Sequence, residues 1–479
     1  MKKSIACYCC ILLALTGLGA QCNKNGSPGK AQHSPSAGPG ELWLTRADQT
    51  VLLEKQPGPG IRFGTEQNGY PWLDIDERKR YQTIDGFGYT LTGGSAQLIW
   101  QMDATSRTVL LKELFSKDAR SIAVSYLRVS MGASDLDASV FSYNDLPEGQ
   151  TDLKQSRFSL ASDTAALIPV LKMILAINPA IKIIATPWSA PLWMKDNHQS
   201  KGGRLKREYY DAYAAYFVTY LRAMKARGIS IDAITPQNEP LHPGNNPSMY
   251  MTAEEQRDFI KNSLGPAFSA ARLRTKIVVY DHNLDRPDYP AVIYKDAEAA
   301  KYVDGAAFHL YAGEVGTMGR LHDDFPQKNL YFTEQWTGSK GNFDSDLQWH
   351  IKNVIIGTMR NWSKTALEWN LAGDPSYGPH TPGGCTQCKG ALTINGSAVS
   401  RNVSYYIIAH ASKFVPPGSV RIASSIDGVV PNVAFLRPDG KKVLIALNEA
   451  AAPSTVNIRY QHQWAPVTIA AKSVMTMVW

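Results

Sequence analysis

Short apolar segments alternate with helix-like segments from about residue 84 to about residue 410. The apolar segments are unbroken runs, which is typical of parallel strands covered on both faces. Between them, apolar residues recur at three- and four-residue spacing in Thr164–Ile177, Tyr209–Arg227 and Ala253–Leu264, which predicts helices. The alternation predicts an α/β protein with a closed (β/α)8 barrel. The expected barrel strands are Thr83–Gly88, Tyr126–Ser130, Ile181–Thr186, Asp232–Pro236, Lys276–Tyr280, Gly305–His309, Asn329–Thr333 and Ala366–Trp369.

The end of the chain has a different pattern, in which short strands follow one another without helices. Turn sequences such as Asp427-Gly428 and Pro438-Asp439-Gly440 separate them. Glu41–Leu53 and Ile75–Arg80 have the same character before the barrel begins. We expect one appended antiparallel β-sandwich built from both chain ends, because that arrangement gives each set of strands its partners. The expected C-terminal strands are Val420–Ser424, Val429–Leu436, Lys442–Glu449, Ser454–Arg459 and Val467–Val478.

The first 22 residues have the pattern of an export signal. Two lysines follow Met1, and the apolar run Ile11–Leu15 is too short to span a membrane. Leu18–Cys22 resembles a bacterial lipoprotein processing site in which Cys22 is the lipidated residue. Gln21 stands where such sites usually have a small residue, so cleavage at an ordinary signal-peptidase site remains the alternative. We expect an exported protein that contacts a membrane only through this lipid anchor, in the periplasm or on the outer-membrane surface, or else a secreted protein.

The whole chain is therefore expected to have five parts. Residues 1–22 are the signal peptide, and residues 23–40, rich in Asn, Gly, Ser and Pro, form a flexible tether. Residues 41–80 contribute the first sandwich strands, residues 81–412 form the barrel, and residues 413–479 complete the sandwich.

Composition narrows the class of protein without changing this picture. The chain has 479 residues, 19% of them charged, with ordinary glycine and proline content, so disordered, collagen-like and coiled-coil classes are excluded. No block of lysine and arginine is long enough to indicate nucleic-acid binding. The chain offers no metal-ligand cluster and no dinucleotide fingerprint, so we expect neither a metal nor a cofactor. The aromatic content suits a sugar-stacking cleft, but equally a large core.

Cys385 and Cys388 form a lone C-x-x-C. A zinc site would need a second pair of ligands, and no partnering motif exists in the chain. A redox motif would open a helix, whereas this one follows Pro382-Gly383-Gly384 in a loop. In an oxidising compartment the expected state is a disulfide that stiffens the loop, with free thiols as the alternative.

Two glutamates stand where barrel enzymes keep their catalytic groups. Glu239 follows the fourth expected strand and Glu334 follows the seventh, both at the carboxyl ends where the active sites of such barrels lie. Strands four and seven lie across the barrel mouth, so the two carboxylates can face each other. Paired carboxylates suit glycosidic cleavage, in which one group protonates the leaving oxygen and the other attacks the anomeric carbon. Taken singly, each could equally be an ordinary surface glutamate at a strand end.

The surroundings of both glutamates resemble glycoside hydrolase family 30, which includes glucosylceramidases and β-1,6-glucanases. Six ordered segments between about Tyr81 and Ser424 carry this resemblance, which is far more specific than a lone Asn-Glu-Pro. The segments are Gln82–Gly88, Leu127–Asp135, Ala185–Lys195, Gln237–Pro240, Phe332–Glu334 and Glu368–Leu371.

The resemblance implies Glu239 as acid/base and Glu334 as nucleophile, with their carboxylates about 5–5.5 Å apart. It implies that Asn238 binds the sugar 2-hydroxyl. The pKa of Glu239 should be raised, chiefly by the negative charge of Glu334. Arg128 matches an arginine near the nucleophile, with a buried ion-pair partner as the alternative, and His309 is a site histidine or a structural one. The expected substrate site consists of Arg128, Asp135, Trp188, Asn238, His309, Tyr311 and Trp369.

The expected activity is retaining hydrolysis of a β-linked glucan, with a β-1,6-glucan as the substrate. The loop from Asp374 to Ala391, which carries the C-x-x-C, departs from the ceramide-cleaving members and looks closer to the glucanase branch. Hydrolysis of glucosylceramide, or exo-action on glucosides, xylosides or fucosides, is the enzymatic alternative. The alternative from another class is a carbohydrate-binding lipoprotein without turnover, which the presence of both glutamates disfavours.

Overall fold

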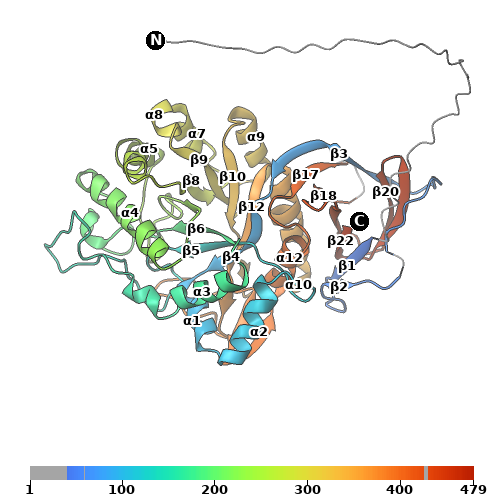
Figure 1. Cartoon of the computed structure of the whole chain (residues 1–479), viewed down its shortest axis with the longest axis horizontal. Coiled ribbons are helices and arrows are strands. Elements are labelled where there is room, and N and C mark those ends of the chain that lie inside the picture. Colours follow the sequence, from blue (N-terminus) through green and yellow to red (C-terminus); the bar gives the residue numbers. More distant parts are fainter. Residues whose placement is uncertain (1–39, 59, 426–429) are drawn as a thin grey trace, which may run out of the picture. The chain divides into compact units, whose positions relative to one another are not determined.

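The computed structural model describes residues 40–58, 60–425 and 430–479 (Figure 1). The predicted signal peptide, the lipidated Cys22 and nearly all of the predicted tether lie outside the described residues. Within the described ranges, no helix is both long enough and apolar enough to cross a membrane.

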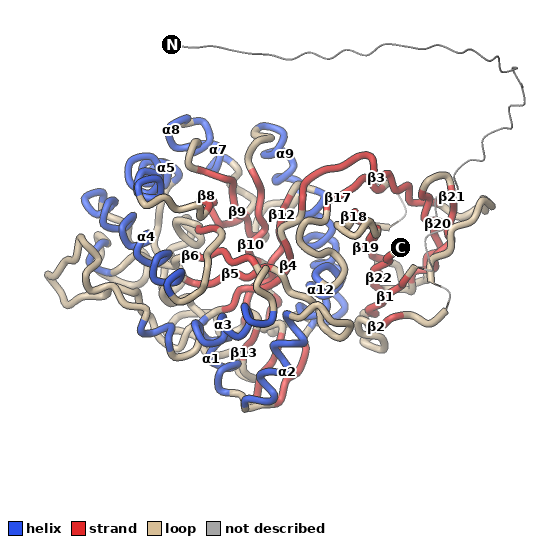
Figure 2. Tube along the Cα trace, in the orientation of Figure 1, coloured by secondary structure: helices blue, strands red, loops and turns tan. Residues whose placement is uncertain are grey.

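Eight parallel strands of the described chain close into a barrel, which confirms the predicted fold (Figure 2). All eight coincide with the expected segments to within three residues at each end. The first starts three residues later than expected, because Thr83 still pairs with Val420 of the sandwich, and Gly86, at φ 146°, begins the barrel strand. The barrel strands are β4 (Gly86–Leu91), β5 (Tyr126–Ser130), β6 (Lys182–Thr186), β7 (Ala233–Ile234), β8 (Lys276–Asn283), β9 (Val303–His309), β10 (Asn329–Glu334) and β12 (Ser363–Asn370).

Helices pack around the barrel, and the three predicted ones are present, the first two with trimmed ends. The third begins at a capping box between Thr252 and Glu255 and continues through a π-helical turn at Ile260–Leu264. A second π-helical segment spans Ile351–Gly357. The helices are α1 (Gly93–Gln101), α2 (Ala104–Phe115), α3 (Leu167–Ile177), α4 (Tyr210–Ala226), α5 (Ala253–Phe259), α6 (Gly265–Ala270), α7 (Asp288–Lys295), α8 (Ala297–Ala300), α9 (Gly316–Asp324), α10 (Phe343–His350), α11 (Thr358–Arg360) and α12 (Val403–Ser412).

Both chain ends build the β-sandwich, as expected. Its strands follow the order β2-β1-β22-β19-β18-β17-β3-β20-β21, so the N-terminal strand β3 lies between C-terminal strands, and β1 and β2 extend the sheet beyond β22. Leu44, Leu73, Leu444 and Met477 are among the buried side chains of its core. The strands are β1 (Glu41–Arg46), β2 (Glu54–Lys55), β3 (Trp72–Thr83), β17 (Val420–Ser424), β18 (Asn432–Leu436), β19 (Lys442–Asn448), β20 (Ser454–Tyr460), β21 (Gln463–Ile469) and β22 (Ser473–Val478).

The sandwich differs from the prediction in two respects. The expected strand Val467–Val478 is two strands, because the chain turns after Ile469 and Lys472 adopts a φ of 44° there. The sandwich is also not purely antiparallel, since β20 pairs with β3 in parallel. β3 is the long strand that leads from the sandwich to the first barrel strand (Figure 1).

Helix α12 joins the barrel to the sandwich through a buried histidine. One ring nitrogen of His410 lies 2.8 Å from Thr476 Oγ1 of β22, and the other lies 2.8 Å from Thr45 Oγ1 of β1. Burial lowers the pKa of His410 to about 3, so the ring is neutral. The barrel is thereby fixed to strands from both ends of the chain.

Two small sheets form at the mouth of the barrel. The first pairs β11 (Thr337–Gly338) with β14 (Cys388–Lys389), and the second contains β13 (Ala372–Gly373), β15 (Leu392–Asn395) and β16 (Ala398–Arg401). Because β11 and β13 follow the seventh and eighth barrel strands, these sheets tie the loop between residues 374 and 391 to the carboxyl end of the barrel.

Candidate active site

Glu239 lies five residues beyond β7, in a strained backbone conformation. Its φ is 42°, which is uncommon for a residue with a side chain. Two backbone hydrogen bonds hold this conformation: Glu239 N–H donates to Asp281 C=O at 3.0 Å, and His242 N–H donates to Glu239 C=O at 2.8 Å. The Glu239 residue is buried, with 8% of its surface exposed. Strain held in this way at a strand end is a feature of functional sites.

Glu334 is the last residue of β10 and is held by two side-chain donors. Arg128 Nη1 donates to Glu334 Oε2 at 2.6 Å, and the hydroxyl of Tyr311 donates to Oε1 at 2.9 Å. Arg128 is fully buried, whereas the Tyr311 residue is 39% exposed although its hydroxyl points inward. Two donors and a buried positive charge stabilise an ionised carboxylate at this position.

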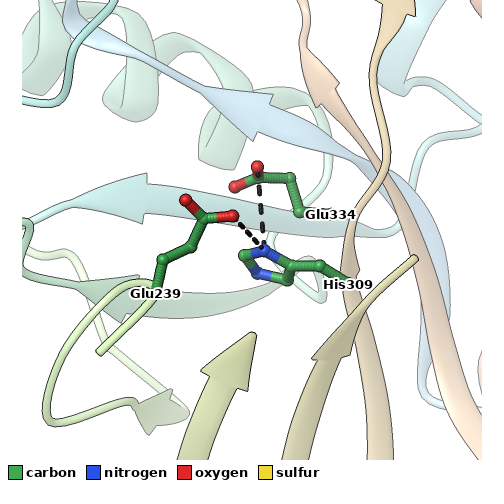
Figure 3. Close-up of side chains that lie close together, drawn as sticks. All are labelled: Glu239, His309 and Glu334. Carbon is green, nitrogen blue, oxygen red and sulfur yellow. Dashed lines mark hydrogen bonds and ion pairs between the residues drawn. The ribbon is translucent and has the colours of Figure 1, made fainter. Parts of the chain in front are cut away.

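The two glutamates face each other across His309 (Figure 3). Nδ1 of His309 lies 3.2 Å from Glu239 Oε1 and 3.8 Å from Glu334 Oε1. One carboxylate oxygen of each glutamate and a ring nitrogen of His309 all lie within 4.8 Å of one another. This close approach is of the kind found in retaining glycosidases, where the carboxyl groups are about 5–5.5 Å apart, and not the wider inverting separation.

Asp281 lies beneath the site and was not singled out from the sequence. Its carboxylate accepts hydrogen bonds from Arg128 Nη2 at 2.8 Å, from the hydroxyls of Thr235 and Thr333 at 2.9 and 2.6 Å, and from His309 Nε2 at 3.1 Å. Burial opposes ionisation of Asp281, but the charge of Arg128 and these hydrogen bonds hold its pKa well below the usual range. The signal that could have found it is positional, since it directly follows the expected strand Lys276–Tyr280.

Arg128 ties the nucleophile position to Asn238. Its Nη2 donates to Asn238 Oδ1 at 2.6 Å and also to Asp281 Oδ2, and its Nη1 donates to Glu334 Oε2. The guanidinium is fully buried, and its hydrogen bonds fix the positions of these three side chains. Because Asn238 Oδ1 is taken by this bond, the amide nitrogen of Asn238 is left to donate to a ligand.

His309 carries a proton in this arrangement. Burial opposes a charge on the ring, but the carboxylates of Glu334, Asp281 and Glu239 surround it and raise the pKa of His309 to about 9. Burial also opposes ionisation of Glu239, yet the hydrogen bond and charge of His309 hold the pKa of Glu239 below its ordinary value. Burial raises the pKa of Glu334, against the stabilising charges of His309 and Arg128. The expectation of a raised pKa on Glu239 is therefore wrong, because the hydrogen bond and charge of His309 outweigh the effect of burial.

Two tryptophans and an aspartate form one wall of the site. Trp188 and Trp369 are 1% and 4% exposed, and their ring centroids lie 5.5 Å apart. The Arg128 guanidinium lies 4.8 Å from the Trp188 ring centroid, which fixes that ring from behind. Asp135 lies at the end of the segment after β5; burial, then the charges of Glu334 and Glu239, raise its pKa to about 7.

The loop between residues 374 and 391 packs against these three side chains. Cys385 and Cys388 are joined by a disulfide. The backbone N–H of Cys385 donates to Asp135 Oδ2 at 3.3 Å, and Cys388 packs in one buried cluster with Trp188 and Trp369. The disulfide loop therefore contacts the same side chains that the sequence assigned to substrate binding.

Glu239, His309 and Glu334 are also the only group of the described residues whose ligand atoms are close enough to share a metal ion. A cation there would be repelled by the guanidinium of Arg128, whose Nη1 lies 2.6 Å from Glu334 Oε2. It would also have to displace the proton between His309 and the carboxylates. These three side chains therefore suit proton transfer better than the binding of a divalent cation. The expectation that no metal is required stays a prediction.

Family models match nearly all of the described chain. A model described as the glycosyl hydrolase family 30 TIM-barrel domain matches residues 84–415, and one described as the glycosyl hydrolase family 30 beta sandwich domain matches residues 418–477. These two matches meet between α12 and β17, where the barrel gives way to the sandwich.

Individual relatives fall into two groups by name. An endo-1,6-beta-D-glucanase of Neurospora crassa is 33% identical over 432 residues, covering 85% of this chain and 88% of the relative. The lysosomal acid glucosylceramidase of Mus musculus is 32% identical over 415 residues, covering 80% of this chain and 79% of the relative. Among solved structures, that of the endo-beta1,6-glucanase BT3312 is 36% identical with a TM-score of 0.85, and the match covers 92% of this chain and 99% of that one.

Proposed function

The chain belongs to glycosyl hydrolase family 30, and on that premise we propose that it hydrolyses β-1,6-linked glucan as a retaining, endo-acting enzyme. The observation that carries the chemistry is the approach of the Glu239 and Glu334 carboxylates to within 4.8 Å at the barrel mouth. The substrate is proposed from the names of the relatives, three of which are endo-1,6-beta-glucanases of 32–33% identity to this chain.

In the first step, Glu334 attacks the anomeric carbon and forms a glycosyl ester. Its carboxylate is held by Arg128 and Tyr311, so one geometry is fixed before the substrate arrives. The amide nitrogen of Asn238 lies beside it and donates to the sugar 2-hydroxyl. Trp188, Trp369 and Asp135 form the wall that receives the remaining hydroxyls and the ring of the same sugar.

The leaving oxygen receives its proton from Glu239, and His309 supplies that proton. The charge of Glu334 is the largest of the influences that raise the pKa of His309. This charge disappears as Glu334 forms the ester, so His309 then holds its proton less tightly and releases it to Glu239, 3.2 Å away. Proton delivery is thereby coupled to bond formation. In the second step Glu239 takes a proton from water, which hydrolyses the ester with overall retention.

The test is product analysis after incubation with β-1,6-glucan, β-1,3-glucan and glucosylceramide in parallel. Release of short β-1,6-linked oligosaccharides from the first substrate alone supports the proposal. Preferential release of glucose from glucosylceramide would favour the second candidate, which the likeness to the murine glucosylceramidase supports.

We also propose that the protein is exported and anchored through Cys22. The support is the leader sequence alone, with its lysines, apolar run and Leu18–Cys22 segment. Fractionation of cells that produce the protein or its Cys22→Ser variant tests this. The parent protein should be recovered with membranes and the variant in the soluble fraction, whereas equal distributions would reject the anchor.

A further inference from the structure

Aromatic side chains gather at one edge of the sandwich, where Tyr70 and Trp72 are exposed and Trp464 is half-buried. Tyr70 and Trp72 are 48% and 45% exposed, which makes them two of the most exposed large apolar side chains of the described chain. Trp464 meets Trp72 edge to face, with ring centroids 5.7 Å apart. Single exposed apolar residues need no explanation, but a group of them on one face indicates a binding surface.

Trp72 is the first residue of β3 and Trp464 lies on β21, with β20 between these two strands at one edge of the sandwich (Figure 2). Tyr70 precedes β3 by two residues. Asn457 of β20 lies opposite Trp72 on one side and opposite Pro466 on the other, while Arg459 lies opposite Trp464. The rings therefore stand over a short width of sheet, about the size of a few sugar units. β21 is the last strand of this sheet, and on its outer side Gly64 pairs with Trp464 through two backbone hydrogen bonds of 2.9 and 2.8 Å, which fix the position of the Trp464 backbone.

A charged pair between the tryptophans supplies fixed hydrogen-bonding groups. The Arg459 guanidinium lies 5.9 Å from the Trp72 centroid and 5.7 Å from the Trp464 centroid. Arg459 also donates two hydrogen bonds to Asp74, each of 2.8 Å. Arg459 remains 37% exposed and Asp74 45% exposed at the side chain, so both can also meet a ligand.

A hollow of about 320 Å³ continues from this pair. Its lining includes Asp74 and Arg459 together with Glu77, Arg78, Gln461 and His462. Aromatic faces beside a hollow with amide, carboxylate and guanidinium groups are complementary to a sugar, which has both apolar C–H faces and hydroxyl edges.

We propose that Tyr70, Trp72 and Trp464, with the hollow beside them, form a second binding surface for the β-glucan chain, here called the aromatic surface. This inference rests on the proposed function for the identity of the polymer. A polysaccharide chain extends beyond the sugars next to the cleaved bond. A second contact on the same protein keeps the polymer at a high effective concentration near the catalytic groups.

Affinity electrophoresis tests the aromatic surface. The catalytically inactive Glu334→Gln protein is run in native gels that contain β-1,6-glucan, β-1,3-glucan or xylan. It is compared with the same protein carrying Trp72→Ala and Trp464→Ala, and with one carrying Tyr70→Ala. The matched control is Trp100→Ala, since Trp100 is also an exposed tryptophan beside an arginine but lies on α1 of the barrel.

We expect β-1,6-glucan to retard the Glu334→Gln protein and its Trp100→Ala control equally. The apparent Kd of the Trp72→Ala/Trp464→Ala protein should rise at least fivefold, and that of the Tyr70→Ala protein at least twofold. Equal retardation of all four proteins in every gel would overturn the proposal. If the double variant melts early, Tyr70→Ala decides, because the Tyr70 residue is 48% exposed and its replacement removes little packing.

The outcome is separable from that of the proposed function. If the active enzyme releases no product from β-1,6-glucan, but another polysaccharide retards the protein through Trp72 and Trp464, the surface stands and the assigned substrate fails. If the active enzyme cleaves β-1,6-glucan while the variants and the control bind it alike, the assigned substrate stands and the surface fails.

Discussion

Arg128 donates a hydrogen bond of 2.6 Å to Glu334, and neither side chain is more than slightly exposed. The same guanidinium bonds to Asn238 and to Asp281, so one buried cation fixes the nucleophile and its neighbours together. A lysine has one compact ammonium group and cannot reproduce this planar, multiple contact.

Replacement of Arg128 by lysine should therefore lower kcat while it preserves the charge. We expect kcat to fall at least about 10²-fold, since the geometry of attack is lost. Steady-state kinetics with an aryl β-glucoside measures this. Arg360→Lys is the matched control, because Arg360 makes a similar set of hydrogen bonds to Ser424, Ser425 and Asn432 of the sandwich. A kcat of the Arg128→Lys enzyme within threefold of the parent would contradict the assigned role.

The two glutamates should respond differently to removal. Glu239→Ala should still form the glycosyl-enzyme from a glucoside with a good leaving group, because that step needs no proton donor. Hydrolysis of the intermediate should then be slow, and added azide should restore turnover and give a β-linked glucosyl azide. Hydrolysis of β-1,6-glucan, whose leaving group needs protonation, should fall at least about 10²-fold.

Glu334→Gln should form almost no glycosyl-enzyme with any substrate, since the attacking carboxylate is gone. Intact-protein mass spectrometry after rapid quenching distinguishes the two variants. If Glu334→Ala retains fast glycosylation of the activated substrate and Glu239→Ala does not, the two roles are reversed.

The activity should decline at alkaline pH as His309 loses the proton that it passes to Glu239. The pKa of His309 is raised to about 9, so this proton is present below that pH and is lost as the pH rises through it. We expect kcat/KM on β-1,6-glucan to decline through the same range. In His309→Gln the proton must reside on Glu239 itself, so the limb should move at least one pH unit lower.

His410→Gln is the control for this profile, because His410 is equally buried but bonds only to Thr45 and Thr476 away from the site. Its profile should match that of the parent. An alkaline limb that stays in place in His309→Gln would show that another group supplies the proton.

Loss of the Cys385–Cys388 disulfide should weaken substrate binding more than it slows chemistry. The loop it closes holds Asp135 and packs against Trp188 and Trp369, whereas Glu239 and Glu334 lie outside it. We expect the Cys385→Ser/Cys388→Ser enzyme to show a KM about fivefold higher and a kcat within about twofold. The melting temperature should change little, because so short a loop restricts the unfolded chain only slightly.

Treatment of the parent enzyme with dithiothreitol should reproduce the rise in KM, and the same treatment of the double variant should have no effect. Detection of two free thiols in the purified protein, or a parent KM that does not respond to reduction, would exclude this role for the disulfide.

Much of the fold followed from the sequence because buried parallel strands leave continuous apolar runs. The errors lie where local signals were missing. The turn between β21 and β22 has neither glycine nor proline, and Lys472 takes up the left-handed conformation, so one strand was expected there. Thr83 was assigned to the barrel, because nothing in the local sequence indicates that it pairs with Val420 of the sandwich.

The site residues could be predicted where position and motif coincide, as for Glu239 and Glu334. Asp281 was missed because its importance comes from hydrogen bonds donated by strands far apart in the chain. The direction of the pKa shift of Glu239 was wrong for a related reason. It depends on the placement of His309 between two carboxylates, which no sequence spacing encodes.

The anomeric form of the first product released from β-1,6-glucan tests the central claim most directly. Proton NMR can follow the reaction before the sugar equilibrates in water. Double displacement by Glu334 and Glu239 predicts that the new reducing ends appear first as the β-anomer and convert later to the equilibrium mixture. Initial appearance of the α-anomer would contradict the retaining mechanism, and no release from β-1,6-glucan would contradict the assigned substrate.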